Sequence, residues 1–565
     1  MAVGSAEIPV VRLTSRERMA TMTIASVSID AAGPSTPLER IWMSVGYDEL
    51  NWTATPRGRA NMGTLHSVFG GPAVVRAHNL LTSGNARGLP HWSSGNVYHE
   101  DASGNAMYDW GELDKTFDVW IENGMVPLVE LGFCPIQLSR ASAREFNPMP
   151  SLYGAYESWG WASPPRDENK WADLVEAVVR HCVERYGRDE VSTWYWELWN
   201  EPDIAYWQGT VEEYCRFYDH TVGAVRKVLP GAAVGGPATT GGGAAFLEAF
   251  LRHCTEGINA VTGEHGTAID FVSFHTKGAP EFRRTYGPIG RDGALAARKE
   301  SPSTQKMLDE INTNLGVIRA YSSYRDIPVF VDECDPGVPA HMGVFDNENY
   351  GFRNNEYYAV FQLQLMAALL EDRSDAARGI SLATAWAWYM ENDRYFEGTR
   401  SFFTASDIAL PVTNAYRMLA RLGTHKLAAK VGQPTHQDTR VGALASSKGG
   451  GGVSVIVWNH DDDQQCSGSE AQVDITIANI GMAGSAVRIR EYLIDRDHSN
   501  SHTAWLSLGA PQNPSPDEIV TMRTRGALEV VAEERMGRCP RLLARSISLR
   551  QPGAALLEIV PLRNE

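Results

Sequence analysis

An alternation of apolar, β-rich segments with helical stretches runs from about residue 40 to about residue 425. Such alternation is typical of βαβ units, which place parallel strands in one sheet and helices outside it. Eight such segments occur, the number that closes a (β/α)₈ barrel. We therefore predict an α/β fold with a TIM barrel over residues 36–428. The predicted strands are 41–46, 73–78, 126–133, 193–200, 232–236, 270–275, 328–333 and 382–389.

The stretches between these strands have helical periodicity. From Trp171 to Tyr186, apolar residues recur at three- and four-residue spacing, and Gly187 follows directly. This pattern predicts an amphipathic helix with one buried face that ends at a glycine. The segment 113–121 repeats the pattern, and Gly124 closes it before the third strand.

After about residue 429 the apolar residues alternate with period two between turn-rich breaks. This change predicts an accessory antiparallel β-sandwich over residues 429–565. The segment 21–30 also alternates, so we expect residues 1–35 to supply N-terminal strands to that sandwich. The predicted sandwich strands are 453–458, 473–478, 487–494, 527–532 and 546–551.

Composition excludes several classes of protein. The net charge is −17, and nucleic-acid binding needs clustered Lys and Arg, so no nucleic-acid partner is expected. No apolar run approaches the ~20 residues of a membrane span. The N-terminus lacks the pattern of a secretory signal, which favours a cytoplasmic protein. The seven cysteines are scattered without CxxC pairs, which fits neither a disulfide framework nor a zinc site.

Two glutamates terminate predicted strands. Glu201 follows 193–200 and precedes Pro202, and Glu333 ends 328–333. Catalytic groups of such barrels come from the C-terminal ends of strands, so both should face one mouth. Glycoside hydrolysis needs an acid and, in retaining enzymes, a nucleophile ~5–5.5 Å away. A single glutamate at a strand end is more often a cap or an ion-pair partner, but the pair favours a glycosidase.

Three tryptophans lie beside the first glutamate. If Trp194, Trp196 or Trp199 faced the pocket, its apolar ring would help to raise the pKa of the acid. Neither HxH nor HExxH spacing occurs, so we expect no metal and no cofactor. Two alternatives stay open at this point, an inverting glycosidase and a barrel that binds carbohydrate without cleaving it.

The motifs around these glutamates resemble glycoside hydrolase family 39 of clan A. The resemblance covers about residues 40–425, and the C-terminal sandwich is typical of the family. The motifs are WNEPD (199–203), VDECDP (331–336), VRAHNLL (75–81), LRHCTEGINAVTGEHG (251–266), FVSFHTKG (271–278) and AWYMENDRYFEGTR (387–400).

The resemblance implies an exo-acting, retaining enzyme with a double-displacement mechanism. It implies homo-oligomers, as dimers or tetramers, and an oligosaccharide as the small-molecule partner. The lack of long apolar runs predicts that no membrane is a partner. The implied roles are Glu201 as acid/base, Glu333 as nucleophile, Asn200 at the sugar 2-hydroxyl, and His78, His275 and Trp388 at the sugar in the −1 subsite. As single residues, the histidines have a structural role as the competing interpretation.

The family contains β-D-xylosidases and α-L-iduronidases, which differ in a carboxylate on C5. A uronate calls for cations, and Lys277, Asp393 and Arg400 match the iduronidase positions that hold the substrate carboxylate. The competing interpretation is a structural network that joins Lys277 to Asp393 or Glu397.

Several features favour a xylosidase instead. The loop after Glu333 lacks the tryptophan of iduronidases, the segment 351–358 resembles bacterial β-xylosidases, and no secretory or lysosomal signal is visible. The sequence therefore predicts a β-D-xylosidase acting on xylo-oligosaccharides. The alternative is an α-L-iduronidase or another family member that releases a uronic acid, arabinose or galactose.

Overall fold

The structure, a computed structural model, describes most of the chain. The described residues are 23–84, 94–141, 160–279, 301–338, 342–371, 379–390, 394–432, 440–464, 466 and 468–562.

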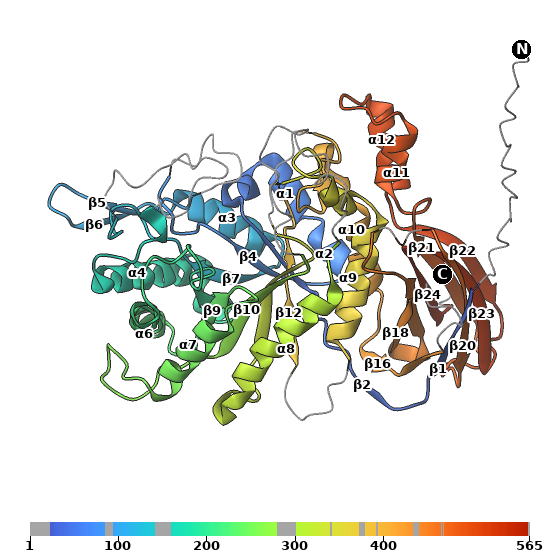
Figure 1. Cartoon of the computed structure of the whole chain (residues 1–565), viewed down its shortest axis with the longest axis horizontal. Coiled ribbons are helices and arrows are strands. Elements are labelled where there is room, and N and C mark those ends of the chain that lie inside the picture. The colour runs from blue at the N-terminus through green and yellow to red at the C-terminus, as the bar shows by residue number, and fades with distance from the viewer. Residues whose placement is uncertain are drawn as a thin grey trace, which may run out of the picture.

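A sheet of parallel strands forms the centre of the larger body (Figure 1). Its strand order is β12-β11-β10-β9-β8-β7-β4-β3-β13, which follows the chain around a barrel. The eighth strand is divided in two: β12 pairs with β11, whereas β13 pairs with β3, so the two halves together nearly close the sheet. The (β/α)₈ prediction is thereby confirmed. The strands are β3 (Ser44–Tyr47), β4 (Val74–Ala77), β7 (Val126–Leu131), β8 (Tyr195–Leu198), β9 (Ala233–Thr239), β10 (Phe271–Lys277), β11 (Val329–Asp335), β12 (Ile380–Ala383) and β13 (Ala385–Trp386).

Helices surround this sheet and bury their apolar faces on it. The predicted helix 171–186 is α4, which Asp167 caps and Gly187 ends; Trp171, Leu174 and Val178 are among its buried residues. The barrel helices are α1 (Pro56–Met62), α2 (Leu65–Phe69), α3 (Gly111–Glu122), α4 (Glu168–Tyr186), α5 (Arg188–Val191), α6 (Val211–Val228), α7 (Ala244–Glu256), α8 (Thr304–Ala320), α9 (Glu356–Leu369) and α10 (Pro411–Ala420). Two small hairpins project from loops, β5 (Tyr98–Glu100) with β6 (Ala106–Tyr108) and β14 (Phe403–Thr404) with β15 (Ile408–Ala409).

Two sheets form the smaller body beside the barrel. One has the order β17-β1-β20-β23 and the other β2-β16-β18-β19-β24-β21-β22. Strand β1 lies between β17 and β20, so the described part of the chain runs from the sandwich to the barrel and back. The strands are β1 (Thr23–Asp30), β2 (Ser35–Pro37), β16 (His425–Leu427), β17 (Ala429–Gly432), β18 (Val441–Ser447), β19 (Val453–Asn459), β20 (Glu470–Ala478), β21 (Val487–Ile494), β22 (Glu529–Met536), β23 (Leu542–Arg550) and β24 (Gly553–Pro561).

A pair of helices that the sequence patterns did not predict links the two bodies. Helices α11 (Ser501–Ser507) and α12 (Pro516–Arg525) lie between β21 and β22 and project from the sandwich (Figure 1). The ring of Trp505 lies 4.9 Å from that of Phe396, and the Gln512 side chain bonds both the backbone N–H and the carbonyl of Tyr395. The sandwich therefore supports the barrel loop that follows the eighth strand.

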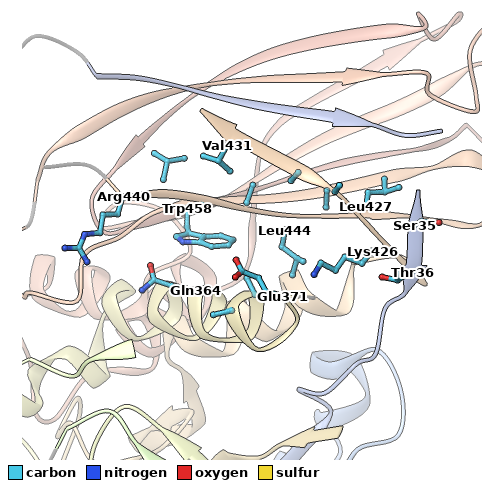
Figure 2. A pocket seen from close by; sticks show the side chains of 18 of the residues that line it. Ser35, Thr36, Gln364, Glu371, Lys426, Leu427, Val431, Arg440, Leu444 and Trp458 are labelled. Carbon is cyan, nitrogen blue, oxygen red and sulfur yellow. The ribbon is translucent and has the colours of Figure 1, made fainter. Parts of the chain in front are cut away.

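A cavity of about 890 Å³ lies between α9 and the sandwich (Figure 2). Gln364, Glu371, Lys426 and Trp458 are among its lining residues, and none of its lining residues ends a strand of the barrel. All seven cysteines are free, and six of them are buried. Among the described residues, no helix is both long and apolar enough to span a bilayer.

Candidate active site

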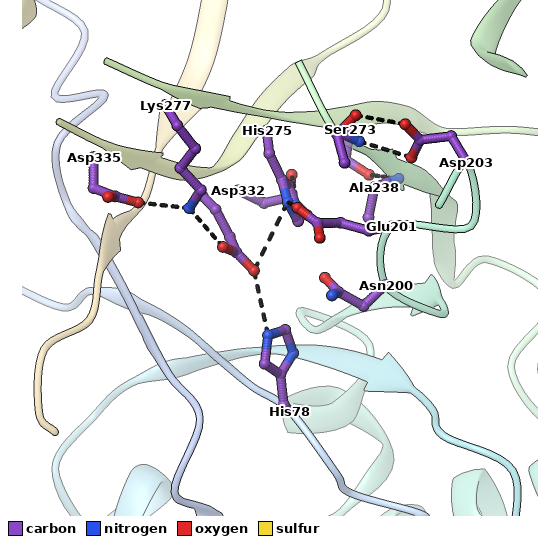
Figure 3. A network of polar contacts seen from close by, with 12 residues as sticks. His78, Asn200, Glu201, Asp203, Ala238, Ser273, His275, Lys277, Asp332 and Asp335 are labelled. Atoms are coloured by element: carbon purple, nitrogen blue, oxygen red, sulfur yellow. Dashed lines mark hydrogen bonds and ion pairs between the residues drawn. The ribbon is translucent and has the colours of Figure 1, made fainter. Parts of the chain in front are cut away.

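A sharp backbone turn after β8 places Glu201. Trp199 and Glu201 have φ values of 71° and 45°, a left-handed conformation that is costly for residues other than glycine. Local bonds hold the turn: the Glu201 N–H donates to the Ala238 carbonyl at 2.9 Å, and Asp203 accepts from both the backbone N–H and the hydroxyl of Thr240. The loops after β8 and β9 are thereby fixed to each other (Figure 3).

The second glutamate lies near the end of β11 and faces the first. One oxygen of Glu201, one nitrogen of His275 and one oxygen of Glu333 all lie within 4.8 Å of one another. His275 Nδ1 is 2.8 Å from Glu201 Oε1 and 3.8 Å from Glu333 Oε1. The side chain of Glu201 is 15% exposed and that of Glu333 only 5%. The two predicted carboxylates thus share one mouth, where one is reachable from solvent and the other is enclosed.

Positive charges surround Glu333. Burial alone would raise the pKa of this carboxyl, but Lys277 and the two neighbouring histidines outweigh burial and hold the pKa well below its usual range. Lys277 Nζ lies 2.6 Å from Glu333 Oε2. An ionised carboxylate that is partly screened by the cations around it suits a nucleophile.

Arg76 forms the floor of the site and is fully buried. Its guanidinium lies 3.0 Å from Glu130 Oε2, 2.7 Å from Glu197 Oε2 and 3.4 Å from Glu333 Oε1. It also donates to Asn200 Oδ1 at 3.0 Å, which fixes the amide of that residue beside the two glutamates. One cation on β4 therefore orients side chains from β7, β8 and β11.

His78 contacts three carboxylates. Its Nδ1 lies 2.6 Å from Glu130, and its Nε2 lies 3.3 Å from Glu333 and 3.4 Å from Asp48. Burial would lower the pKa of His78, but Glu130 and the other acidic groups raise it to about 10. The imidazole is therefore a cation at neutral pH and stabilises the ionised form of Glu333.

The two predicted cations converge on a residue that the motifs had not singled out. Asp335 Oδ2 accepts from Lys277 Nζ at 2.5 Å (Figure 3). The same oxygen accepts from Arg400 Nη1 at 2.6 Å. Lys277 thus pairs with Glu333 and Asp335, and not with Glu397 as the structural interpretation supposed. Asp393 lies outside the described residues.

The aromatic residue on the floor is Trp386. Its ring lies 4.5 Å from that of His78 and 5.3 Å from the Arg76 guanidinium carbon. A Cβ on Gly46 would come within 2.1 Å of this ring, so only glycine fits there. The predicted residue, Trp388, is fully buried against a separate cluster formed by Phe69, Phe402 and Phe403.

The tryptophans beside Glu201 do not form a wall of the site. All three are fully buried and turned toward the helices: Trp194 packs on Phe117 of α3, and Trp199 on Trp171 of α4. Trp196 lies 6.1 Å from Trp194. An inward orientation was the condition for raising the acid's pKa. Trp194 and Trp196 instead alternate with the inward-facing Glu197, and Trp199, which lies in the turn after β8, packs on α4.

A signal in the sequence could have found the residues that were missed. Glu130 and Glu197 each interrupt an apolar strand, and a charge within such a run marks an inward-facing position. Arg76 and Asp335 are two residues from His78 and Glu333, so they share the same face of their strands.

Comparison with known proteins identifies the family of this chain. The family model described as glycosyl hydrolases family 39 matches residues 26–534. A β-xylosidase of Geobacillus stearothermophilus is 26% identical, over 87% of each chain. A human α-L-iduronidase is 25% identical, over 92% of this chain and 75% of the relative.

Solved structures show the same fold. A bacterial orthologue of human α-L-iduronidase superposes with a TM-score of 0.76 at 20% identity, over 96% of this chain and 85% of that one. A monomeric β-xylosidase of Caulobacter crescentus superposes with a TM-score of 0.74 at 19% identity, over 95% of this chain and 100% of that one. Because the family model covers most of the sequence, the chain belongs to glycosyl hydrolase family 39 and is a glycosidase.

Proposed function

We propose that the protein is a retaining exo-glycosidase in which Glu333 is the nucleophile and Glu201 the acid/base. The observation that carries this proposal is the close approach of the two carboxylates, whose oxygens lie within 4.8 Å, because inverting enzymes leave ~6.5–9.5 Å for a water. The different surroundings of the two groups support the roles. Glu333 is enclosed by cations, and Glu201 is the more exposed of the pair.

The proposed reaction has two displacements. Glu333 attacks the anomeric carbon while Glu201 protonates the departing glycosidic oxygen, which gives a glycosyl ester on Glu333 and releases the aglycone. Glu201, now a carboxylate, takes a proton from water, whose oxygen attacks the anomeric carbon and displaces Glu333. The sugar leaves with its original anomeric configuration.

Several side chains surround the place where the sugar must lie. We propose that Asn200, His78 and His275 contact it, because each is held by a bond to Arg76, Glu130 or Glu201 and is not free to swing away. Pre-orientation of this kind lowers the cost of ordering the substrate. Roles for Trp388 and Asp393 stay predictions.

For the sugar we propose β-D-xylose. In the part of the site that the structure describes, Lys277 and Arg400 are already bound to Asp335, so a substrate carboxylate would have to displace that residue. A neutral pentose enters such a site without a further charge penalty.

A uronide is the second candidate. The observation that favours it is the convergence of Lys277 and Arg400 within bonding distance of one oxygen, a geometry that could also grip a substrate carboxylate if Asp335 gave way. The α-L-iduronidases among the relatives agree with this candidate.

Substrate preference distinguishes the two sugars. With p-nitrophenyl β-D-xyloside and an aryl α-L-iduronide measured side by side, we expect kcat/KM to favour the xyloside on the order of 100-fold or more. A comparable preference for the iduronide would replace xylose by a uronic acid and leave the roles of the two glutamates untouched.

Substitution of Lys277 tests the electrostatic control of the nucleophile. Because Lys277 lowers the pKa of Glu333, we expect Lys277→Met to raise it and to move the acid side of the kcat/KM profile to higher pH by about one unit or more. Lys170→Met, which removes a lysine paired with Glu100 away from the site, should leave the profile in place. An unmoved acid limb in both variants would show that Glu333 does not set it.

The helical pair of the sandwich should influence substrate binding. Trp505 packs on Phe396, four residues before Arg400, so we expect Trp505→Ala to loosen that loop and raise KM about 10-fold with little change in kcat. Leu506→Ala, an exposed neighbour on α11, is the matched control. Thermal destabilisation without a rise in KM would limit the helices to a structural role.

The proposal also covers the cellular compartment, the binding partners and the oligomeric state of the enzyme. Six buried free thiols fit a reducing compartment such as the cytoplasm. We propose a xylo-oligosaccharide as the partner molecule and expect a homo-oligomer, which sedimentation would test. Neither nucleic acid nor membrane is proposed as a partner.

A further inference from the structure

Asp332, the neighbour of the nucleophile on β11, has surroundings that do not suit a charged carboxylate. Its side chain is fully buried. Within the described part of the chain, neither of its oxygens receives a hydrogen bond. A buried carboxylate is tolerated in its ionised form only when donors replace the water it has lost.

Arg76, the cation beside Asp332, does not donate the hydrogen bond that an ionised Asp332 would require. Arg76 Nε lies 3.4 Å from Asp332 Oδ2 but only 2.7 Å from Glu197 Oε2. Nε carries a single hydrogen, and the shorter contact assigns it to Glu197. The Ser273 hydroxyl donates to the other oxygen of Glu197 at 2.6 Å. Both oxygens of Glu197 thus receive hydrogen bonds, as an ionised carboxylate requires. Asp332 lies near the same Arg76 nitrogen but receives no hydrogen bond from it.

The remaining charged groups around Asp332 make ionisation less favourable still. Glu333 follows it in the chain, and Glu130 and Glu333 share the guanidinium of Arg76 with Glu197. From β10, His275 Nε2 lies 3.7 Å from Asp332 Oδ1, beyond hydrogen-bond distance. Four carboxyl groups around one guanidinium repel one another unless one of them keeps its proton.

We propose that Asp332 is a positioning residue that stays protonated at neutral pH and donates its proton to Glu197. Asp332 and Glu197 together then carry one negative charge beside Arg76. Arg76 keeps the orientation in which it contacts Asn200 and Glu333. Burial raises the pKa of Asp332 well above its usual range, and the charge of Glu197 and a hydrogen bond to it raise it further, against a smaller opposing effect of Arg76.

The consequence concerns the nucleophile and rests on the role proposed above for Glu333. An ionised Asp332 would add a negative charge beside Glu333 and favour protonation of the nucleophile. A neutral Asp332 spares the site that charge. A buried acid without donors of its own thereby helps its neighbour on the strand to remain a carboxylate.

Infrared spectroscopy tests the protonation state without any substrate, so its failure is distinguishable from failure of the proposed function. At pH 7.5 the wild-type spectrum should contain the C=O stretch of a carboxylic acid, which side-chain ¹³C labelling of aspartate shifts. Asp332→Asn should remove that band. Glu356→Gln, which removes a different, partly buried acid whose pKa burial also raises, should leave it in place.

Kinetics test the positioning role. Asparagine is neutral and keeps an N–H that can donate to Glu197, so Asp332→Asn should hold kcat/KM within about threefold and leave the acid limb of the pH profile where it was. Asp332→Ala lacks the donor and should lower kcat/KM about 10-fold.

Either of two results would overturn the proposal. One is a wild-type spectrum at pH 7.5 without an aspartic-acid band, which stays decisive even if no variant folds. The other is an acid limb that moves to lower pH by about one unit in Asp332→Asn, the sign expected when an ionised neighbour of Glu333 is removed.

Discussion

Replacing Glu333 by glutamine is expected to lower kcat on the order of 10⁴-fold or more. A carboxamide cannot form the glycosyl ester, and Lys277, now 2.6 Å from a neutral group, loses half of its negative partners. The measurement is kcat on an aryl glycoside, with enzyme purified on fresh resin so that traces of wild type do not set the rate.

A matched control separates this effect from a general effect of substituting a buried acid. Glu356 is partly buried, and burial raises its pKa, so Glu356→Gln replaces a partly enclosed acid outside the site and should keep nearly full activity. If Glu333→Gln retained more than about a tenth of the wild-type kcat, Glu333 would not be the nucleophile.

Removal of the acid/base should give a loss that depends on the leaving group. In Glu201→Ala, departure of a poor leaving group has no proton donor, so kcat/KM for an alkyl glycoside or a disaccharide should fall on the order of 10³-fold. An activated aryl leaving group needs little protonation, so kcat/KM for a dinitrophenyl glycoside should fall far less. The comparison requires both substrates on the same enzyme preparation.

Azide provides the complementary test of Glu201. Azide attacks the glycosyl ester without base assistance, so it should restore turnover of the dinitrophenyl glycoside in Glu201→Ala and yield a glycosyl azide of retained configuration. The Glu333→Gln variant has no ester to be attacked and should show no such rescue. Equal losses for all leaving groups, with no azide product, would remove Glu201 from the acid/base role.

The barrel and its two glutamates could be predicted because strong local signals coincide there. Apolar runs at regular intervals indicate the strands, and a carboxylate at the end of such a run, with Pro202 behind it in one case, indicates the rim. The helix 171–186 could also be predicted, because its apolar face and the glycine that follows it both indicate a helix that ends at Tyr186.

The features that escaped prediction depend on which way a side chain turns. The eighth strand was expected to run to residue 389, but β13 ends at Trp386, so the ring on His78 comes from Trp386 and Trp388 packs elsewhere. Where a strand ends is set by long-range pairing with β3, which no local pattern reports. The same holds for the outward turn of the tryptophans beside Glu201.

Charge networks within the barrel are a further feature that local sequence patterns did not predict. Lys277 and Arg400 were expected near the sugar from motif positions alone. Their shared partner Asp335 could not be predicted, because it lies beside Lys277 only through the pairing of β10 with β11. Helices α11 and α12 were missed because their sequence is short and polar. Their contacts with Tyr395 and Phe396 are made across domains.

Proton NMR of the first product formed tests the central claim most directly. Whichever glycoside the enzyme hydrolyses, the two facing carboxylates within 4.8 Å predict that the released sugar first appears in the anomeric form of the substrate, β-xylose from a β-xyloside, before mutarotation. First appearance of the opposite anomer would contradict the account, because it would require a water between the carboxylates in place of a glycosyl ester on Glu333.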